Sequence, residues 1–228
     1  MKFTLRYLSA IASLAFVLPS YGENNNETGN GSETVMAQEH QNNPGPVMPQ
    51  KSQTNMHTRH NSLGNNFAHK GIVILESPYR LNVSAAVEFE SVINAYIQLK
   101  NALVVDDEKA TDTAIELLAE SVTAVNSTLL HDEGLEAWQN HRKLYESKLR
   151  EMLHIKGLGK KRSYFSHISE IMFCMVKSFG LKSGDLFVLY CPMAFDGKGA
   201  YWISDNKKIQ NPYFGKAMPT CGEIREEL

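Results

Sequence analysis

The chain has 228 residues, of which 43% are hydrophobic and 21% charged, and its formal net charge is −2. This composition fits one ordinary globular domain with additional sequence, and it offers no basic stripe of the kind that binds nucleic acid. Three cysteines are too few for a small scaffold held together by many disulfides.

The first residues have the pattern of an export signal. Lys2 and Arg6 supply a basic start, an apolar run follows over residues 8–18, and small residues precede a cleavage site before Glu23. The apolar run is shorter than the roughly 20 residues that cross a bilayer. We therefore predict a signal peptide over residues 1–22 and an exported mature chain without membrane insertion.

A polar segment follows over residues 23–70. It is rich in Asn, Gln, Gly, Ser and Pro, so it buries too little apolar surface to offset the entropy cost of ordering, and we interpret it as a disordered linker. Met56, His57 and His60 could form a metal-capturing arm, but we prefer to interpret them as scattered members of the linker. The folded domain is predicted over residues 71–228.

This domain opens with a short apolar run at residues 71–75, which is either an edge strand or a packed lead-in. Apolar residues then recur at helical spacing in four stretches. The predicted helices cover residues 83–105, 106–131, 135–155 and 160–179. Asp106 or Asp107 is a natural N-cap for the second helix, and Gly180 ends the fourth. Four amphipathic helices with short connections predict an all-α fold, an antiparallel four-helix bundle.

After Gly180 the hydrophobic period changes. Residues 186–189 and 200–203 resemble short extended pieces among turns. The aromatic residues of this segment argue against disorder, and a long irregular segment in a compact domain is usually functional or disordered. We therefore predict an irregular C-terminal loop segment that wraps against the helical bundle and is braced by it.

Two pairs of sulfur side chains lie in this segment. Cys191 and Met193 stand two residues apart, so in extended backbone their side chains point to the same face. Met218 and Cys221 stand three residues apart with Pro219 between them, which is a favoured β-turn spacing. If the two pairs meet, two thiols and two thioethers converge, and such ligands favour Cu(I) or another soft ion.

The same cysteines permit a second interpretation. Two cysteines in an exported protein commonly form a disulfide, and a bridge between Cys191 and Cys221 would stabilise the fold by about 2–4 kcal/mol. Metal binding requires reduced thiolates, so the two states exclude each other. A disulfide needs neither methionine, but a methionine can also fill a core. Residue chemistry alone leaves both states open.

A longer pattern surrounds the sulfur residues. It comprises Tyr190-Cys191-Pro192-Met193-Ala194, Trp202, Ile209, residues 211–215, Met218 and Cys221-Gly222, with further matches at residues 96–103, 106–107, Arg162, Phe165 and Ser169. In these residues the chain resembles a family of periplasmic helical domains of unknown function. Members of that family occur alone or attached to the periplasmic adaptors of heavy-metal (copper) efflux pumps.

The resemblance implies a function in the periplasm. It implies the handling of copper or a related heavy metal, with Cys191, Met193, Met218 and Cys221 as the ligands. The partner that it implies is a heavy-metal efflux system or its adaptor. Pro219 departs from the family pattern, where Leu is more usual, and it bears on the angle at which Met218 points.

Three further residues are considered as members of the site, and we expect mainly structural roles for them. Cys174 lies beside the apolar stripe of the fourth helix, where we expect a small buried hydrophobe. His167 shares that flank and would become an additional ligand if the tail folded over it. Arg162 opens the helix, where positive charge is unfavourable. It either makes a tertiary contact with Asp106, Asp107 or the tail, or lies in a solvated basic patch.

The sequence shows no phosphate-binding loop, nucleophile elbow or paired catalytic carboxylates, so we predict that the protein is not an enzyme. We predict a periplasmic accessory or carrier that binds a Cu(I)-type ion and is linked to heavy-metal efflux. The alternative is a helical docking module stapled by a Cys191–Cys221 disulfide, without metal. In that alternative the surface near Trp202, Tyr213 and Phe214 meets a periplasmic partner.

Overall fold

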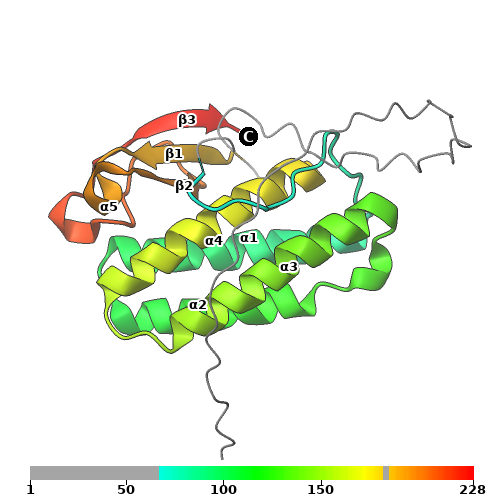
Figure 1. Cartoon of the computed structure of the whole chain (residues 1–228), viewed down its shortest axis with the longest axis horizontal. Coiled ribbons are helices and arrows are strands. Elements are labelled where there is room, and N and C mark those ends of the chain that lie inside the picture. The colour runs from blue at the N-terminus through cyan, green and yellow to red at the C-terminus, as the bar shows by residue number, and fades with distance from the viewer. Residues whose placement is uncertain (1–66, 182–184) are drawn as a thin grey trace, which may run out of the picture. The chain divides into compact units, whose positions relative to one another are not determined.

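The computed structural model describes residues 67–181 and 185–228 (Figure 1). Four long helices make up most of this part of the chain: α1 (Val83–Val104), α2 (Glu108–Ala124), α3 (Asp132–Leu153) and α4 (Leu158–Phe179). The prediction of four helices is confirmed. The predicted signal peptide and most of the predicted linker lie outside the described residues. None of the helices within the described ranges is both long enough and apolar enough to cross a bilayer.

The second helix is shorter than predicted. Asp107 is its N-cap, because the Asp107 side chain accepts a hydrogen bond from a backbone N–H of the first turn. The helix ends at Ala124, and the side chain of Asn126 then accepts the backbone N–H of Thr128 at 3.1 Å. This local bond competes with helix continuation, and the chain passes into a short 3-10 helix, η2 (Ser127–Leu129).

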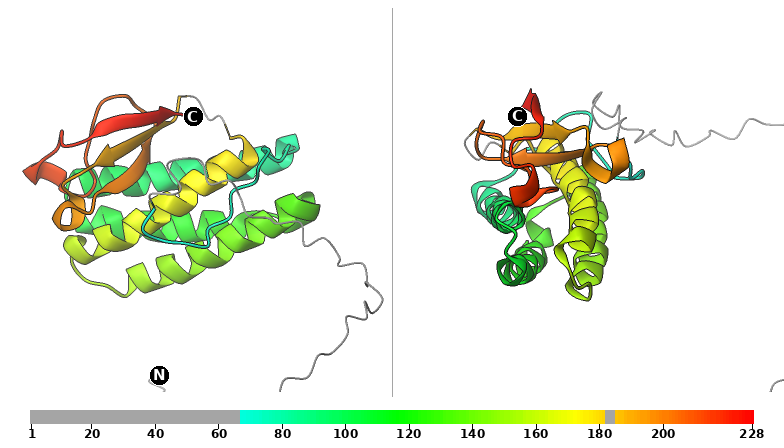
Figure 2. Two further views of the ribbon diagram at one scale, coloured as in Figure 1. Left: turned by 45° about the horizontal axis from the view of Figure 1, so that its top comes forward. Right: turned by 90° about the vertical axis from the view of Figure 1, so that its left-hand side faces the viewer.

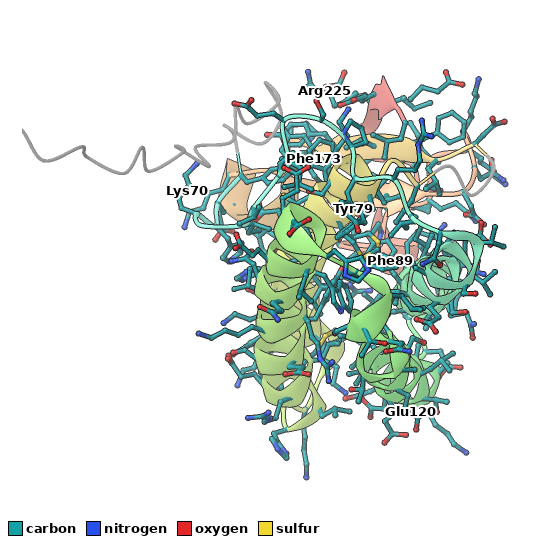
Figure 3. All side chains as sticks on the ribbon, turned by 90° about the vertical axis from the view of Figure 1, so that its right-hand side faces the viewer. Lys70, Tyr79, Phe89, Glu120, Phe173 and Arg225 are labelled. Atoms are coloured by element: carbon teal, nitrogen blue, oxygen red, sulfur yellow. The ribbon has the colours of Figure 1, made fainter. Side chains whose placement is uncertain are left out.

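The helices pack against one another in chain order, α1 on α2, α2 on α3 and α3 on α4 (Figures 1 and 2). Aromatic side chains fill the space between them. Phe89 of α1, labelled in Figure 3, lies with its ring 4.8 Å from that of Trp138 and 4.5 Å from that of Phe179. All three side chains are buried, so α1, α3 and α4 share one hydrophobic core.

The C-terminal segment forms a small antiparallel sheet. The extended pieces predicted at residues 186–189 and 200–203 are confirmed as strands, whereas the third strand and the pairing of all three replace the irregular loop that we expected. The strands of the sheet are β1 (Phe187–Cys191), β2 (Ala200–Ser204) and β3 (Glu223–Glu227), in the order β2-β1-β3. Two short helices, α5 (Ala194–Gly197) and η3 (Gly215–Ala217), lie in the connections. The chain is therefore mostly helical but not all-α, and Figure 2 shows the sheet stacked on the helices.

The third strand was missed for a physical reason. Prediction of a strand relies on alternating apolar residues, whereas β3 reads Glu-Ile-Arg-Glu-Glu and is mostly exposed. It pairs with only one neighbour, β1, and so lies at the sheet edge. Charged residues are the usual means by which an edge strand avoids pairing with other chains.

Tyr96 joins the sheet to two helices. Its hydroxyl lies 2.8 Å from the hydroxyl of Ser169 on α4, and it accepts the backbone N–H of Ile203 on β2 at 3.0 Å. The Tyr96 side chain is buried, and desolvation raises the pKa of its phenol. One hydroxyl on α1 thus fixes the position of β2 over α4.

We expect Tyr96→Phe to lower the free energy of unfolding by about 1–3 kcal/mol, because the buried N–H of Ile203 loses its acceptor. Urea denaturation measures this change. Tyr145→Phe is the matched control, since the buried Tyr145 hydroxyl has no hydrogen-bond partner among the described residues. Its removal should be neutral or stabilising, and an equal loss in both variants would contradict the role of Tyr96.

Residues 67–79, here called the strap, cross the helices before α1 begins. The ring of Phe67 is buried, with its centroid 5.2 Å from that of Phe173, so the packed chain begins before the predicted boundary at residue 71. The strap forms no strand. It is the packed lead-in, and Figure 3 labels two of its residues, Lys70 and Tyr79.

Side chains of α3 and α4 hold the strap. Asn140 accepts the backbone N–H of Val73 at 3.1 Å, and the Nε2–H of His141 donates to the Val73 carbonyl at 2.6 Å. On α4, the hydroxyl of Ser178 accepts the N–H of Leu75 at 3.1 Å. The strap therefore receives from side chains the backbone hydrogen bonds that a neighbouring strand would otherwise supply.

Candidate dithiol site

The structure brings two of the four predicted sulfur ligands into contact. Cys191 is the last residue of β1 and is fully buried, whereas Cys221 lies two residues before β3 and is half-buried. Their Sγ atoms lie 3.0 Å apart, and both are free thiols. Two cysteines 30 positions apart thus form one dithiol site.

Pairing of β1 with β3 explains this proximity. Tyr190 pairs with Glu223, so the residues next to this pair, Cys191 and Gly222, lie where the two strands part. A Cβ atom on Gly222 would lie 2.7 Å from the ring of Trp202, and its φ of +147° is one that other residues rarely adopt. Glycine is therefore required beside Cys221.

Asn211 fixes the loop that carries Cys221. Its side-chain N–H donates to the Cys221 carbonyl at 2.6 Å, and its side-chain oxygen accepts the backbone N–H groups of Tyr213 at 2.7 Å and Phe214 at 3.2 Å. Asn211 is fully buried. In the sequence, Asn211 stands out only as part of the longer pattern around the sulfur residues, although an Asn that precedes Pro is a turn signal.

The turn predicted at residues 218–221 is confirmed, because the Cys221 N–H donates to the Met218 carbonyl at 3.3 Å. The extended backbone expected at Met193 is wrong, because the strand ends at Cys191 and Met193 has helical φ and ψ angles. The two-residue spacing therefore no longer argues for a shared face. Met193 is 56% exposed and Met218 is half-buried. Each methionine meets Cys221 through its backbone.

The electrostatics of the site favour a protonated Cys221. The hydrogen bond that the Cys221 thiol makes to Cys191 Sγ and, second, desolvation raise the pKa of Cys221, while a backbone hydrogen bond from Met193 opposes the shift. A thiolate at Cys221 is thus less favourable than at an ordinary cysteine, and a metal ion that binds there must displace the proton. The Met193 N–H would then stabilise the charge.

The distance between the two Sγ atoms is compatible with either disulfide formation or metal binding. A disulfide requires about 2.05 Å between the sulfur atoms, so it needs an approach of about 1 Å. A metal ion with thiolate bonds near 2.3 Å needs the sulfurs to move apart. Within the described residues, no three His, Cys, Asp or Glu side chains are grouped as metal ligands. A metal here would therefore depend on two thiolates and the neighbouring thioethers.

The remaining predicted residues lie away from the thiols. Cys174 is buried in α4, and desolvation raises its pKa well above the usual value, as expected for an inert core thiol. The ring of His167 stacks on that of His69 in the strap, with the ring centroids 3.5 Å apart. The predicted tertiary contact of Arg162 is confirmed, because it bonds both Asp106 and the Pro212 carbonyl of the tail.

The similarity of this chain to a known protein family covers the helices and does not include Cys191 or Cys221. A family model described as "Protein of unknown function (DUF3347)" matches residues 92–184. The match runs from the middle of α1 to the end of α4 and stops before β1. No curated protein and no solved structure matches the chain. A DUF3347 domain, whose function is unknown, thus spans residues 92–184.

Proposed function

We propose that this chain is a periplasmic accessory or carrier that binds a Cu(I)-type soft metal ion at Cys191 and Cys221. In this proposal Met193 and Met218 supply thioethers, and the ion passes to a heavy-metal efflux system or its adaptor. The four helices serve as an antiparallel four-helix bundle that braces the sheet. The observation that carries the proposal is the contact of two free thiols at 3.0 Å, since paired thiolates favour Cu(I).

The exposure of the sulfur residues suits the uptake and release of an ion. Met193 is exposed, Cys221 is half-buried and Cys191 is fully buried. An incoming ion would meet the Met193 thioether first and then exchange it for the two thiolates. Binding releases thiol protons, so the affinity should rise with pH.

The test is competition with a chromophoric Cu(I) chelator, under reducing and oxygen-free conditions. We expect the wild-type protein to withdraw one ion per chain, and Cys191→Ser and Cys221→Ser to lose this competition, because each removes a thiolate ligand. Cys174→Ala is the matched control and should bind as the wild type, since Cys174 lies in α4. Equal binding by all three variants, or none by the wild type, would exclude the dithiol as the copper site.

The thioethers need a separate measurement. Met193→Leu and Met218→Leu keep the size and apolar character of the side chains and remove the sulfur. We expect each to weaken Cu(I) binding less than either cysteine variant. Unchanged affinity in both would limit the site to the two thiols.

A second candidate function is the docking module stapled by a disulfide. The short sulfur separation favours it, because bond formation needs little movement. Thiol counting on protein isolated without reductant separates the two candidates, since a bridge leaves only Cys174 to react after unfolding. Of the three aromatic residues named for the docking surface, Trp202 and Tyr213 are buried and Phe214 is half-buried, so in this candidate Phe214 would make the aromatic contact with the partner.

A further inference from the structure

A polar pocket lies between the strap, α4 and the sheet. It has a volume of about 410 Å³ and is lined by residues from these three parts, among them Ala68, Glu170, Tyr190 and Arg225. This volume falls within the range of small-molecule sites. Tyr190 directly precedes Cys191 on β1, and successive residues of a strand face opposite sides. The pocket is thus separate from the dithiol site.

Two cations border the pocket, Lys198 and Arg225. The guanidinium of Arg225 lies 4.9 Å from the centre of the Tyr190 ring, and one of its nitrogens is 2.5 Å from a Glu223 oxygen. Lys198 makes no ion pair with any residue in the described ranges. At least one cation of the pocket is therefore available to an anionic group.

A buried carboxylate forms another wall. Glu170 is 5% exposed. Its Oε2 accepts the backbone N–H of His69 at 3.2 Å and lies 2.5 Å from His69 Nδ1, while its Oε1 accepts, among the described residues, the N–H of Ala68 at 2.9 Å. A carboxylate oxygen can accept two hydrogen bonds, so Oε1 retains capacity for one more donor.

Gly199 completes the pocket. It has φ of +77°, and a Cβ atom there would lie 1.9 Å from the Tyr190 hydroxyl oxygen. The absence of a side chain lets this hydroxyl lie against the backbone at the pocket lining. A phenol is both donor and acceptor, and in this position it can bind a carboxylate together with Lys198.

We propose that this pocket binds a small zwitterion of the α-amino acid type. Its carboxylate lies between Lys198, Arg225 and the Tyr190 hydroxyl, and its ammonium group donates to Glu170. A plain anion would place a second negative charge opposite Glu170 and leave the open acceptor site of its Oε1 unused, and a plain cation would face the like charges of Lys198 and Arg225. Only a ligand with both charges matches both walls of the pocket.

The first experiment is calorimetric titration of the whole protein with each of the protein amino acids. The best binder is then compared with its deaminated and its decarboxylated analogue, which keep the side chain and lose one charge each. We expect the parent to bind about tenfold or more tightly than either analogue, because each charge-assisted hydrogen bond is strong. If the deaminated analogue bound as tightly as the parent, the proposal would be overturned in favour of a plain anion site. If no amino acid bound, the proposal would also be overturned.

Lys198→Met tests the site itself, because Lys198 is exposed and its replacement leaves the core intact. We expect about a tenfold loss of affinity. Lys208→Met removes an equally exposed cation outside the pocket and should bind the amino acid as the wild type. Unchanged affinity in Lys198→Met overturns the proposal. Copper competition by Lys198→Met should equal that of the wild type, so the two proposals can fail independently.

Discussion

Arg162→Met is expected to lower the free energy of unfolding by about 3–5 kcal/mol, because it leaves polar groups in a largely buried site without their donor. The Arg162 side chain is 13% exposed. Its guanidinium donates to the Pro212 carbonyl at 2.8 Å, to the Leu103 carbonyl at 2.9 Å and to the Asp106 carboxylate. One side chain of α4 thus ties the end of α1 to the loop before η3.

Urea denaturation of Arg162→Met against the wild type measures this loss. Arg162→Lys should recover only part of it, because an ammonium group cannot reproduce the fork of guanidinium donors. Arg150→Met, at an exposed position in the last turn of α3, should cost about 0.5 kcal/mol or less. A similar small cost for Arg162→Met would show that the loop is held by other contacts.

The hydrogen bond between Arg162 and Asp106 also affects the pKa of the Asp106 carboxyl. The N–H of Lys216 and, second, the hydrogen bond from Arg162 lower the pKa of this carboxyl. Loss of Arg162 should therefore move the pKa of Asp106 back toward its usual value. Proton titration followed by NMR would detect this change even where the variant remains folded.

Acidification is expected to destabilise the protein strongly through His141. This histidine is fully buried, its Nε2–H donates to the Val73 carbonyl, and its Nδ1 has no partner within the described residues. Desolvation lowers its pKa from 6.5 to about 4. Between these two values the unfolded chain binds a proton that the folded chain excludes, so the free energy of unfolding falls as the pH falls.

The loss attributable to His141 should reach about 3 kcal/mol once the pH passes below 4. Urea denaturation at several pH values between 7 and 4 measures it. His141→Gln should flatten the profile in this window, whereas His154→Gln, at an exposed position, should leave it as steep as in the wild type. His167, whose pKa desolvation also lowers to about 4, will retain part of the slope. An identical slope in His141→Gln would contradict the assignment.

The helices could be predicted because their information is local. Each has a 3.6-residue apolar period and a recognisable end, such as Asp107 before α2 or Gly180 after α4. The end of α2 could not be placed from this pattern, since Leu129 continues the apolar period that Asn126 interrupts. Side-chain hydrogen bonds at Asn126, to Thr128 and from the Asn126 N–H to Glu88, accompany that boundary.

The sheet and the dithiol were harder to predict because they depend on pairing across the chain. The spacing of Cys191 and Cys221 allowed a meeting only if two distant segments folded together, and the segment responsible, β3, has no strand pattern of its own. The backbone at Met193 was predicted wrongly for a local reason. Its two-residue spacing from Cys191 assumed extended backbone as far as Met193, whereas the strand ends at Cys191.

The pocket could not be predicted from spacing at all, since its residues come from separate segments of the chain. Glu170 lies in α4 amid apolar residues, where a carboxylate suggests an exposed helix face. Its partners, Ala68 and His69, belong to a segment whose polar composition predicts disorder. Phe67 was the one indication of packing in that segment, and a single aromatic residue is weak evidence for it.

The manner in which the strap is attached determines how it would respond to mechanical tension. A strand in a sheet loaded along its length breaks many bonds together, whereas the strap is fastened at separate points: Phe67, then Glu170, then His141, then Ser178. A pull on residue 67 would rupture these points one after another. The strap would therefore peel away at low force, while the helices beneath it stayed folded.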